Sequence, residues 1–432
     1  MSLPLIVFIA TFALCFAIRV PVAIAMMVSA VFYFVLKPGP AASIDIVAVQ
    51  FLTQVPVRFV MIAIPLFVFA AKVMNAGGVT DTIFRWALTL VGRFKGGLGH
   101  VNILASLIFS GMTGAATADA SGLGLMEIEA MRKSGYDDGF SCAVTAASAT
   151  IGPIFPPSIP MILYATLSGA SVGSLFLGGI VPGVLLAIFL MGYVAFIAEK
   201  RDYPKENVKT TFLAWLALTL RALPALLTPV ILLTGIYTGI FTPTEAGAIA
   251  AAWAIMVSFF VYRSMGIKGL WEVFLDSAKT TAVVSVTLGA AFSFSYIISF
   301  EQLARALTEF LLTLSTNKNM LLLVVNVAFL VLGMVINTFV LLVVFVPLVI
   351  PLATALDVNL VHFGVVIILN MMIGLSTPPV GGLLFITSAV SDVPLERIVK
   401  EIIPIVGVMI IVLVLITLIP DLVLFIPSMS GR

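Results

Sequence analysis

The stretch Ala146-Ala-Ser-Ala-Thr-Ile-Gly-Pro-Ile-Phe-Pro-Pro-Ser-Ile-Pro-Met-Ile-Leu-Tyr-Ala-Thr166 decides the fold. It has the composition of a membrane-spanning helix, but its four prolines remove backbone donors and clash with the preceding turn, so the helix must break between Gly152 and Pro160. An unpaired peptide group in hydrocarbon costs several kcal/mol. Broken backbone at membrane depth must therefore be buried in protein or line a polar cavity. This makes the break a candidate binding site.

The break occurs a second time, 222 residues further along the chain. This offset takes Gly152 to Gly374 and Pro156-Pro157 to Pro378-Pro379. Further aligned pairs are Pro21 with Pro243, Gly111-Met112 with Gly333-Met334, and Pro182 with Pro404. Four of the 12 prolines up to Pro204 thus meet a proline, where background frequency predicts roughly 0.6. We interpret the chain as two copies of one unit, a mark of many secondary transporters.

The composition predicts an all-α polytopic membrane protein. Of the 432 residues, 61% are hydrophobic and only 10% are charged, which excludes a soluble globule. A net charge of +2 gives no reason to expect a nucleic-acid partner. The two cysteines, Cys15 and Cys142, lie in apolar segments and predict neither a disulfide framework nor a metal site.

Each predicted unit contains scaffold helices, an amphipathic arm helix along the membrane surface, a re-entrant hairpin, a broken helix and a last long helix. The bland alternative for each arm is a surface anchor. The expected boundaries are 1–198 for the first repeat, with arm 80–96, hairpin 101–132 and broken helix 140–167; 199–223 for a cytoplasmic linker; and 224–432 for the second repeat, with arm 301–315, hairpin 320–355 and broken helix 362–390.

The hairpin assignment decides the topology. Each hairpin segment is an apolar stretch of about 30 residues with a polar middle, which suits two half-length helices better than one crossing of about 20 residues. One unit then has five full crossings, so the second copy is inverted. With most basic residues on the cytoplasmic face, both termini lie outside. A capping box is also expected at Thr242-Pro243-Thr244-Glu245, which makes Glu245 a cap.

Hairpin tips and helix breaks offer free carbonyls to cations and free amides to carboxylates. Two tips and two breaks predict two ion sites flanking one anion site near the midplane. The alternative for any single hydroxyl is a bond to its own helix. Candidate sodium ligands are Ser110, Gly111, Thr113, Thr117, Thr150, Gly152, Gly333, Asn337, Thr338, Gly374, Ser376 and Thr377. Candidate substrate contacts are Ala115, Asp119, Pro157, Ser158, Asn370, Pro378, Pro379 and Gly381.

Charged residues in apolar segments have two interpretations. Asp119, deep in the first hairpin, is either functional or ties the hairpin to its own scaffold. Arg58 and Lys279, inside the third helices, are expected to be snorkelling or paired structural charges. The histidines, His100 and His362, lack any metalloprotease context, and neither a nucleophile elbow nor a phosphate-binding loop occurs. The sequence therefore gives no support for an enzyme or an ATP-driven pump, and no cofactor is expected.

At these residues the chain resembles a known family. The stretches that carry the resemblance are Ser110 to Asp119, Gly152 to Ser158, Phe241-Thr242-Pro243-Thr244-Glu245-Ala246 and Gly374 to Gly381. They are similar to the large membrane subunit of TRAP transporters, the tripartite ATP-independent periplasmic carboxylate importers of the ion transporter superfamily. The resemblance covers nearly the whole chain. It implies an elevator mechanism, sodium ions as coupling ions, and a bacterial or archaeal cytoplasmic membrane. It also implies two partners, a small four-helix membrane subunit and a periplasmic substrate-binding protein.

The leading hypothesis is thus a sodium-driven importer of a small organic anion, such as a C4-dicarboxylate or a sugar acid. Hairpins and broken helices would move as one body against a scaffold of first, second and last helices. A second hypothesis is a stand-alone sodium/divalent-anion symporter that needs no binding protein, and a third is a channel or passive assembly subunit. The sequence does not reveal which carboxylate is carried.

Overall fold

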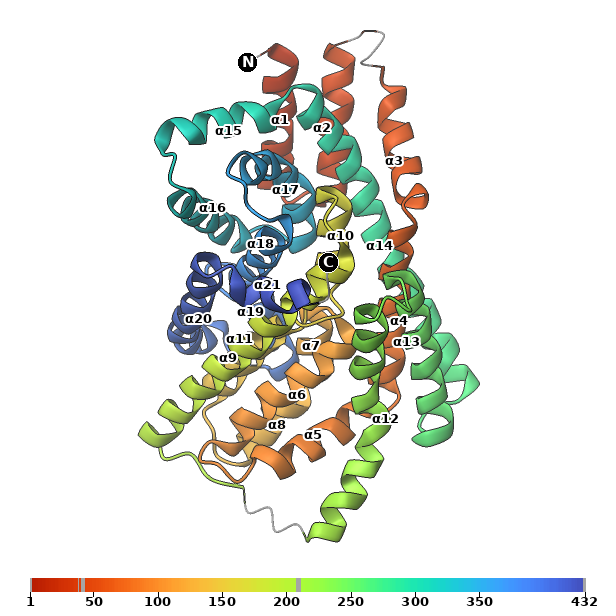
Figure 1. Cartoon of the computed structure of the whole chain (residues 1–432), viewed down its shortest axis with the longest axis vertical. Helices are drawn as coiled ribbons and strands as arrows, with labels where there is room; N and C mark the ends of the chain where they lie inside the picture. The colour runs from red at the N-terminus through yellow and green to blue at the C-terminus, as the bar shows by residue number, and fades with distance from the viewer. Residues whose placement is uncertain (1, 38, 40–42, 207–210, 430–432) are drawn as a thin grey trace.

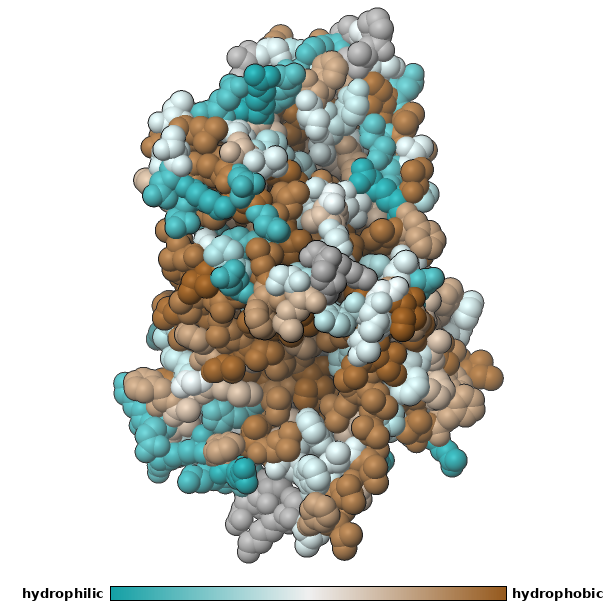
Figure 2. Space-filling view, viewed as in Figure 1, coloured by the Kyte–Doolittle hydropathy of each residue, from teal (hydrophilic) through white to brown (hydrophobic). Residues whose placement is uncertain are grey.

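The chain is built from helices throughout the part that the structure describes. The computed structural model describes residues 2–37, 39, 43–206 and 211–429 and contains no strand among them (Figure 1). Seven of the described helices are long and apolar enough to span a membrane. Figure 2 shows apolar residues gathered across the middle of one face, with hydrophilic residues toward both ends. The chain is therefore a multi-pass membrane protein.

The first half contains eleven α-helices and two 3₁₀ turns. In chain order they are α1 Leu3–Ala17, α2 Val22–Leu36, α3 Asp45–Val57, a 3₁₀ turn Phe59–Ile62, α4 Ala63–Ala76, α5 Val79–Val91, α6 Gly97–Thr113, α7 Ala116–Gly122, α8 Gly124–Lys133, α9 Asp138–Ser148, a 3₁₀ turn Ala149–Ile151, α10 Ile159–Ser168 and α11 Val172–Lys200.

The second half contains ten α-helices in the described residues. They are α12 Phe212–Tyr237, α13 Pro243–Met256 with a π-helical turn over Val257–Val261, α14 Ile267–Phe300, α15 Leu303–Leu314, α16 Lys318–Gly333, α17 Thr338–Ala355, α18 Leu360–Leu375, α19 Gly382–Ser391, α20 Leu395–Leu418 and α21 Asp421–Met429. The expected capping box opens α13: Thr242 Oγ1 accepts from the Glu245 backbone N–H (3.3 Å), and Glu245 Oε2 accepts from the Thr242 N–H (2.8 Å).

The helices form two groups joined by the arms α5 and α15 (Figure 1). The group that we call the scaffold contains α1–α4 and α12–α14, in which α4 packs on α13 and α14 packs on α2, α3 and α4. The second group, which we call the body, contains α6–α11 and α16–α21. The last helices α11 and α20 pack on one another and on the hairpins and broken helices. The last helices, which we expected with the first and second helices, thus pack with the hairpins and broken helices. The third helices, expected at about 51–74 and 273–298, pack with the first and second helices instead.

Three further differences have local causes. Arg58 does not lie inside a helix: it separates α3 from the next turn, two residues after Pro56, which disrupts the preceding turn of helix. The helix α12 begins inside the segment expected as a linker, because the Thr211 side chain caps it by accepting from the Ala214 N–H (3.4 Å). The last long helix, expected over about 397–425, ends at Leu418 because Pro420 interrupts it, and α21 starts at Asp421.

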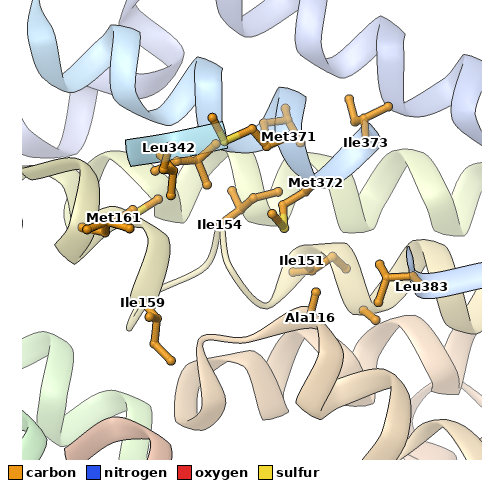
Figure 3. Packing of buried hydrophobic residues seen from close by; sticks show 14 of the residues in the cluster. Ala116, Ile151, Ile154, Ile159, Met161, Leu342, Met371, Met372, Ile373 and Leu383 are labelled. Carbon is orange, nitrogen blue, oxygen red and sulfur yellow. The ribbon is translucent and has the colours of Figure 1, made fainter. Parts of the chain in front are cut away.

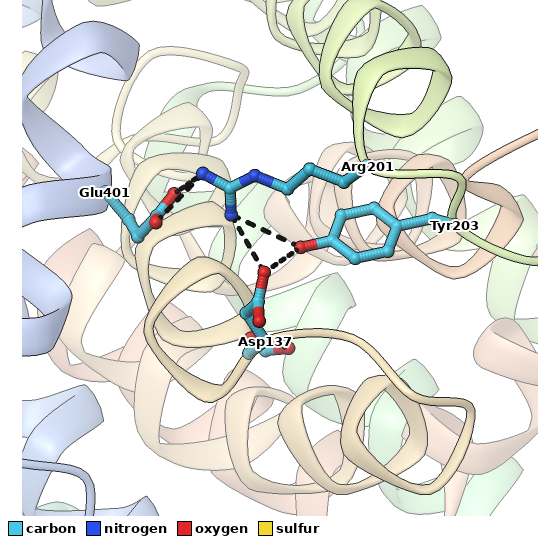
Figure 4. A network of polar contacts seen from close by, with 5 residues as sticks. Asp137, Arg201, Tyr203 and Glu401 are labelled. Carbon is cyan, nitrogen blue, oxygen red and sulfur yellow. Dashed lines mark hydrogen bonds and ion pairs between the residues drawn. The ribbon is translucent and has the colours of Figure 1, made fainter.

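The start of the connection between the halves is fastened to the body by a polar network (Figure 4). Arg201 donates to both carboxylate oxygens of Glu401 on α20, at 3.0 and 2.9 Å, and to Asp137 at 3.0 Å. Tyr203 donates to the same Asp137 oxygen at 2.6 Å. Burial and this hydrogen bond to Asp137 raise the pKa of Tyr203 to about 12, so its hydroxyl remains a donor at physiological pH.

The connection also contacts the residues that follow the first arm, α5. Lys95 Nζ lies 2.8 Å from Asp202 Oδ1, and the hydrogen bond from Lys95 lowers the pKa of Asp202. The backbone N–H of Glu206 donates to the Gly92 carbonyl at 3.0 Å. Residues 201–206 are thus held by the body and by the α5–α6 turn together.

Candidate functional site

The first break begins where α9 tightens into a 3₁₀ turn at Ala149–Ile151 and ends where α10 starts at Ile159. Every residue from Gly152 to Ser158 is buried except Phe155, which is half-buried. Ser158 restarts the helix: its Oγ accepts from the Met161 N–H at 3.2 Å and donates to the Pro153 carbonyl. The broken backbone is therefore sheltered by protein, as membrane depth requires.

The second break separates α18 from α19 over residues 376–381. Gly381 has φ +55°, a left-handed conformation that favours glycine. The N-cap of α19 makes no side-chain hydrogen bond. The two breaks each contain one cis peptide bond, Pro156-Pro157 and Pro378-Pro379.

Each break is hydrogen-bonded to the tip of the preceding hairpin. The Ile159 N–H donates to the Gly114 carbonyl (3.3 Å), and the Gly381 N–H donates to the Met334 carbonyl (3.2 Å). The two donors are separated by 222 residues, the sequence offset between the halves. The contact is close in both halves. A Cβ on Gly114 would lie 2.4 Å from the Pro157 carbonyl oxygen, and one on Gly374 would lie 2.7 Å from the Gly333 carbonyl carbon.

Figure 3 shows that apolar side chains of both hairpins and both breaks pack together at one place. Ala116 comes from the first hairpin and Leu342 from the second, while Ile154 and Met372 come from the two broken helices. All four are buried in one core. The four discontinuities therefore converge, although they are far apart in the sequence.

A small cavity of about 60 Å³ lies at this convergence. Its walls come from both tips and from both broken helices. They are Gly114, Ala115, Ala116, Thr117, Pro153, Ile159, Pro160, Asn337, Thr338, Phe339, Met372 and Leu375. This volume suits ions or one or two waters, since a water occupies about 30 Å³ in the liquid. It does not hold an organic acid.

A larger cavity of about 480 Å³ adjoins it and shares Ala115, Thr117 and Ile159. This cavity separates the first hairpin from the scaffold helices α4 and α14. A third cavity, of about 620 Å³, separates α10 and α11 from Arg58 and the α12–α13 turn. Organic ligands typically occupy cavities of about 300 to 1,000 Å³, so both spaces are large enough for a small acid.

The predicted ion ligands fall into three groups. Thr113, Thr117, Asn337 and Thr338 line the cavities described above. Four hydroxyls donate to carbonyls of their own helix or turn, three or four residues back, and keep lone pairs free for an ion. They are Ser110 to Leu107 (2.6 Å), Thr150 to Ala147 (2.5 Å), Ser376 to Ile373 (3.0 Å) and Thr377 to Ile373 (2.5 Å). The glycines Gly152, Gly333 and Gly374 lie against backbone atoms of neighbouring segments, and Gly111 lies against the side chain of Pro229.

The predicted substrate contacts are also dispersed. Ala115 lines both adjoining cavities, and Ser158 is the cap of α10. Asn370 is buried and donates to the carbonyl and side-chain oxygens of Asn326, at 2.8 and 3.1 Å. Pro157 packs against the hairpin tip at Gly114. Pro378, Pro379 and Gly381 form the turn of the second break.

Asp119 is buried in α7, and the sequence interpretation overlooked its neighbour Glu127 on α8. Both residues are 1% exposed, and none of their four carboxylate oxygens meets hydrogen-bond geometry with a described residue. Asn102 of α6, in contrast, donates to Thr145 (2.7 Å) and accepts from Ser148 (2.7 Å) of α9. The available signal was the spacing of eight residues, about two helical turns, which puts the two acids on the same side of a helix.

Two basic residues that line the cavities were also absent from the predicted site residues. Lys72 of α4 lines the 480 Å³ cavity and donates to Asp276 of α14 at 2.5 Å. Arg58 lines the 620 Å³ cavity and donates to the Thr166 carbonyl at 2.6 Å. Pro56 indicated that the helix is disturbed close to Arg58. The partner of Lys72, Asp276, lies 204 residues away, so no sequence pattern indicated that the two residues pair.

Comparison with known proteins agrees with this architecture. A family model, "Tripartite ATP-independent periplasmic transporter, DctM component", matches residues 9–422. The sialic acid TRAP transporter large permease protein SiaM of Vibrio cholerae is 42% identical over 375 residues, 86% of this chain and 87% of that protein. The C4-dicarboxylate TRAP transporter large permease protein DctM of Pseudomonas aeruginosa is 34% identical over 374 residues, 87% of each. The family resemblance predicted from the motifs is confirmed.

Two further matches define the extent of the likeness. The sialic acid TRAP transporter permease protein SiaT of Haemophilus influenzae is 38% identical over 371 residues, 86% of this chain but 60% of that protein. Among solved structures, the YdaH transporter of Alcanivorax borkumensis superposes with a TM-score of 0.62 at 15% identity, covering 86% of each chain. At that identity the second likeness concerns the fold alone.

Proposed function

The chain belongs to the family of the DctM component, the large permease of tripartite ATP-independent periplasmic transporters, and from this premise we propose that it imports a small organic anion together with sodium ions. The observation that carries the proposal is the convergence of two hairpin tips and two helix breaks at one cavity. Such discontinuities put backbone carbonyls and amides at membrane depth, where both ions and carboxylates need partners.

Sodium is the proposed coupling ion. Its ligands would be carbonyls and hydroxyls at the tips and breaks, with Asn337 and Thr338 at the second tip and Thr113 and Thr117 near the first. The central cavity of about 60 Å³ has the size of an ion site. If two sodium ions accompanied a monoanion, one net charge would cross and contribute about 2.3 kcal/mol per 100 mV.

The proposed movement is an elevator. The two halves would be inverted repeats, an interpretation supported by the hydrogen bonds that Ile159 and Gly381 make at equivalent positions. The body would slide against the scaffold, since cavities separate the two at Lys72 and at Arg58. The 480 Å³ cavity adjoins the central cavity, so the described state would be open on the side of Lys72, which positive-inside reasoning makes the cytoplasm.

The proposed substrate class is a carboxylate. Relatives carry the names of anions: sialic acid, C4-dicarboxylate and, for an Escherichia coli protein, 2,3-diketo-L-gulonate. The proposed partners are a small membrane subunit and a periplasmic binding protein, and the proposed location is the inner membrane with both termini outside. The second candidate, a stand-alone symporter, would need neither partner.

Reconstitution tests the proposal. The chain would be reconstituted into proteoliposomes together with the co-expressed small subunit, and the binding protein would be added outside. Uptake of N-acetylneuraminate and succinate would be measured with an inward sodium gradient. We expect uptake of one acid that needs both the gradient and the binding protein. Uptake that persists without a sodium gradient would refute the coupling, and uptake by this chain alone would establish the stand-alone symporter.

A matched pair of threonines localises the ion sites. Thr377→Ala removes a hydroxyl at the second break, and Thr354→Ala removes an exposed hydroxyl that bonds its own helix in the same way, to Ile350. We expect the first change, but not the second, to raise the sodium concentration for half-maximal uptake at least fivefold. Equal sodium dependence in the two variants and in Asn337→Ala would contradict the assignment.

A further inference from the structure

The cavity between the first hairpin and the scaffold has one wall with a charge suited to an acid. We propose that this 480 Å³ space is an exit subsite for the transported anion, in which Lys72 binds its carboxylate while Asp276 competes for the same ammonium group. The inference rests on the proposed function and deepens it. The predicted site residues include no positively charged side chain to bind the substrate carboxylate, and Lys72 of the scaffold supplies one.

Lys72 is the only basic residue among those that line this cavity in the described chain. Its Nζ uses all three donors at once: it lies 2.5 Å from Asp276 Oδ2, 3.0 Å from the Asp276 carbonyl and 2.6 Å from Thr280 Oγ1. The lysine is thus held by α14 and aimed along the cavity wall. A lysine in this setting binds a carboxylate as a compact point charge.

The two members of the pair differ in exposure. The side chain of Lys72 is 26% exposed, whereas that of Asp276 is 67% exposed. An exposed ion pair contributes little, about 0 to 1 kcal/mol. An arriving carboxylate can therefore take the place of the Asp276 side chain, while Thr280 and the Asp276 carbonyl continue to hold the ammonium group.

The opposite wall supplies polar groups from the hairpin. Thr113 lines this cavity, and its Oγ1 is buried without a hydrogen-bond partner among the described residues. Thr117 and Ser121 of α7 line the same wall. A small acid in the cavity would thus meet the lysine on the scaffold and hydroxyls on the hairpin, the few convergent polar groups that fix a ligand's orientation.

The side chain of Asp276 makes this subsite suited to release of the anion. Asp276 refills the place of a departing anion, so the subsite binds weakly and favours release. The cavity also shares Ala115, Thr117 and Ile159 with the central cavity. An anion leaving the centre would therefore reach Lys72 next.

The test uses the reconstituted three-component transporter and the acid, N-acetylneuraminate or succinate, that the wild type transports. Exchange would be measured as a function of acid concentration on the Lys72 side. We expect Lys72→Gln to raise the half-saturating concentration on that side at least tenfold and Lys72→Arg to restore most of the affinity. Asp276→Asn should lower the half-saturating concentration, because the competitor is neutralised.

Lys279→Gln is the matched control, since Lys279 is exposed on α14 three residues after Asp276 and does not line the cavity. Lys72→Gln that behaves like Lys279→Gln would overturn the exit subsite while leaving the proposed function intact. The same holds if Asp276→Asn weakens binding as Lys72→Gln does, which would mean that the pair is structural. Absence of transport by the wild type would instead refute the proposed function.

Discussion

The two hairpin–break units have a similar backbone and different side-chain chemistry. In each, a backbone N–H of the break donates to a carbonyl of the hairpin tip. The first unit buries Asp119 and Glu127, and none of their carboxylate oxygens meets hydrogen-bond geometry in the described chain. The second buries an amide, Asn370, whose nitrogen donates twice to Asn326 while its oxygen meets no such geometry, and Asn326 in turn donates to Thr417 at 2.8 Å.

This difference distinguishes the backbone groups, which both units share, from the buried acids, which occur in one unit. Carbonyls and amides at the tips and breaks repeat because they come from backbone geometry, which glycine and proline determine in both halves. Charge does not repeat, because an ionised group buried without a partner costs several kcal/mol and is kept only for a specific use. The shared backbone is the candidate ion site, and the acids belong to the first unit alone.

The largest expected effect contrasts the two glycines of the breaks. A Cβ on Gly374 would lie 2.7 Å from a backbone carbon of Gly333, whereas one on Gly152 would lie 3.3 Å from the Ala149 carbonyl oxygen of its own turn and no closer than 3.6 Å to the hairpin, at Ala115. We expect Gly374→Ala to cost about 3 kcal/mol through overpacking and Gly152→Ala to cost under about 0.5 kcal/mol. Thermal unfolding in detergent measures both. Equal melting temperatures would mean that the units pack alike.

The next contrast concerns the buried polar groups. Asn370→Ala removes two hydrogen bonds and leaves Asn326 without its donor, so we expect a loss of about 1 to 3 kcal/mol. Glu127→Gln removes a carboxylate whose oxygens have no hydrogen-bond partner in the described chain, so we expect stability at least equal to that of the parent. Melting temperatures that fall in both variants would show that Glu127 is held by a partner.

A smaller effect is expected at the helix restarts. Ser158 caps α10 with its side chain, whereas α19 starts without a side-chain cap. Ser158→Ala should therefore cost about 1 kcal/mol. A melting temperature unchanged by Ser158→Ala would show that proline and packing alone restart the helix.

The smallest effect depends on pH and concerns only the first half, where Lys95 pairs with Asp202. The pKa of Asp202 is lowered in the folded state, so its contribution is present above the unfolded value near 4 and is lost as pH falls through the folded value. We expect Asp202→Asn to lower the melting temperature slightly at pH 7, by an amount that shrinks as the pH falls below the unfolded value. A difference that does not shrink at acidic pH would exclude this ion pair as its source.

Sequence reasoning located the features that glycine and proline encode. Gly152, Pro156 and Pro157 fix the first break, and Thr242 with Glu245 forms the expected cap, because these are properties of neighbouring residues. Sequence reasoning failed where the result depends on which helix packs against which other helix. The last helices α11 and α20 are apolar on most sides, so no pattern assigns them to the scaffold or the body. The pairing of Lys72 with Asp276 exists only in three dimensions.

Arg201, Tyr203 and Glu206 hold the beginning of the connection between the halves on the body and the first arm, while the connection ends at Phe212, the first residue of the scaffold helix α12. Only six residue steps separate Glu206 from Phe212, and a fully extended chain covers at most about 3.3 to 3.6 Å per residue, roughly 20 Å in all. If the body moves against the scaffold as proposed, this short connection limits how far its two ends can separate. A larger separation would first have to break the contacts of Arg201, so inserting a few glycines into the connection and measuring transport would test whether its length limits the movement.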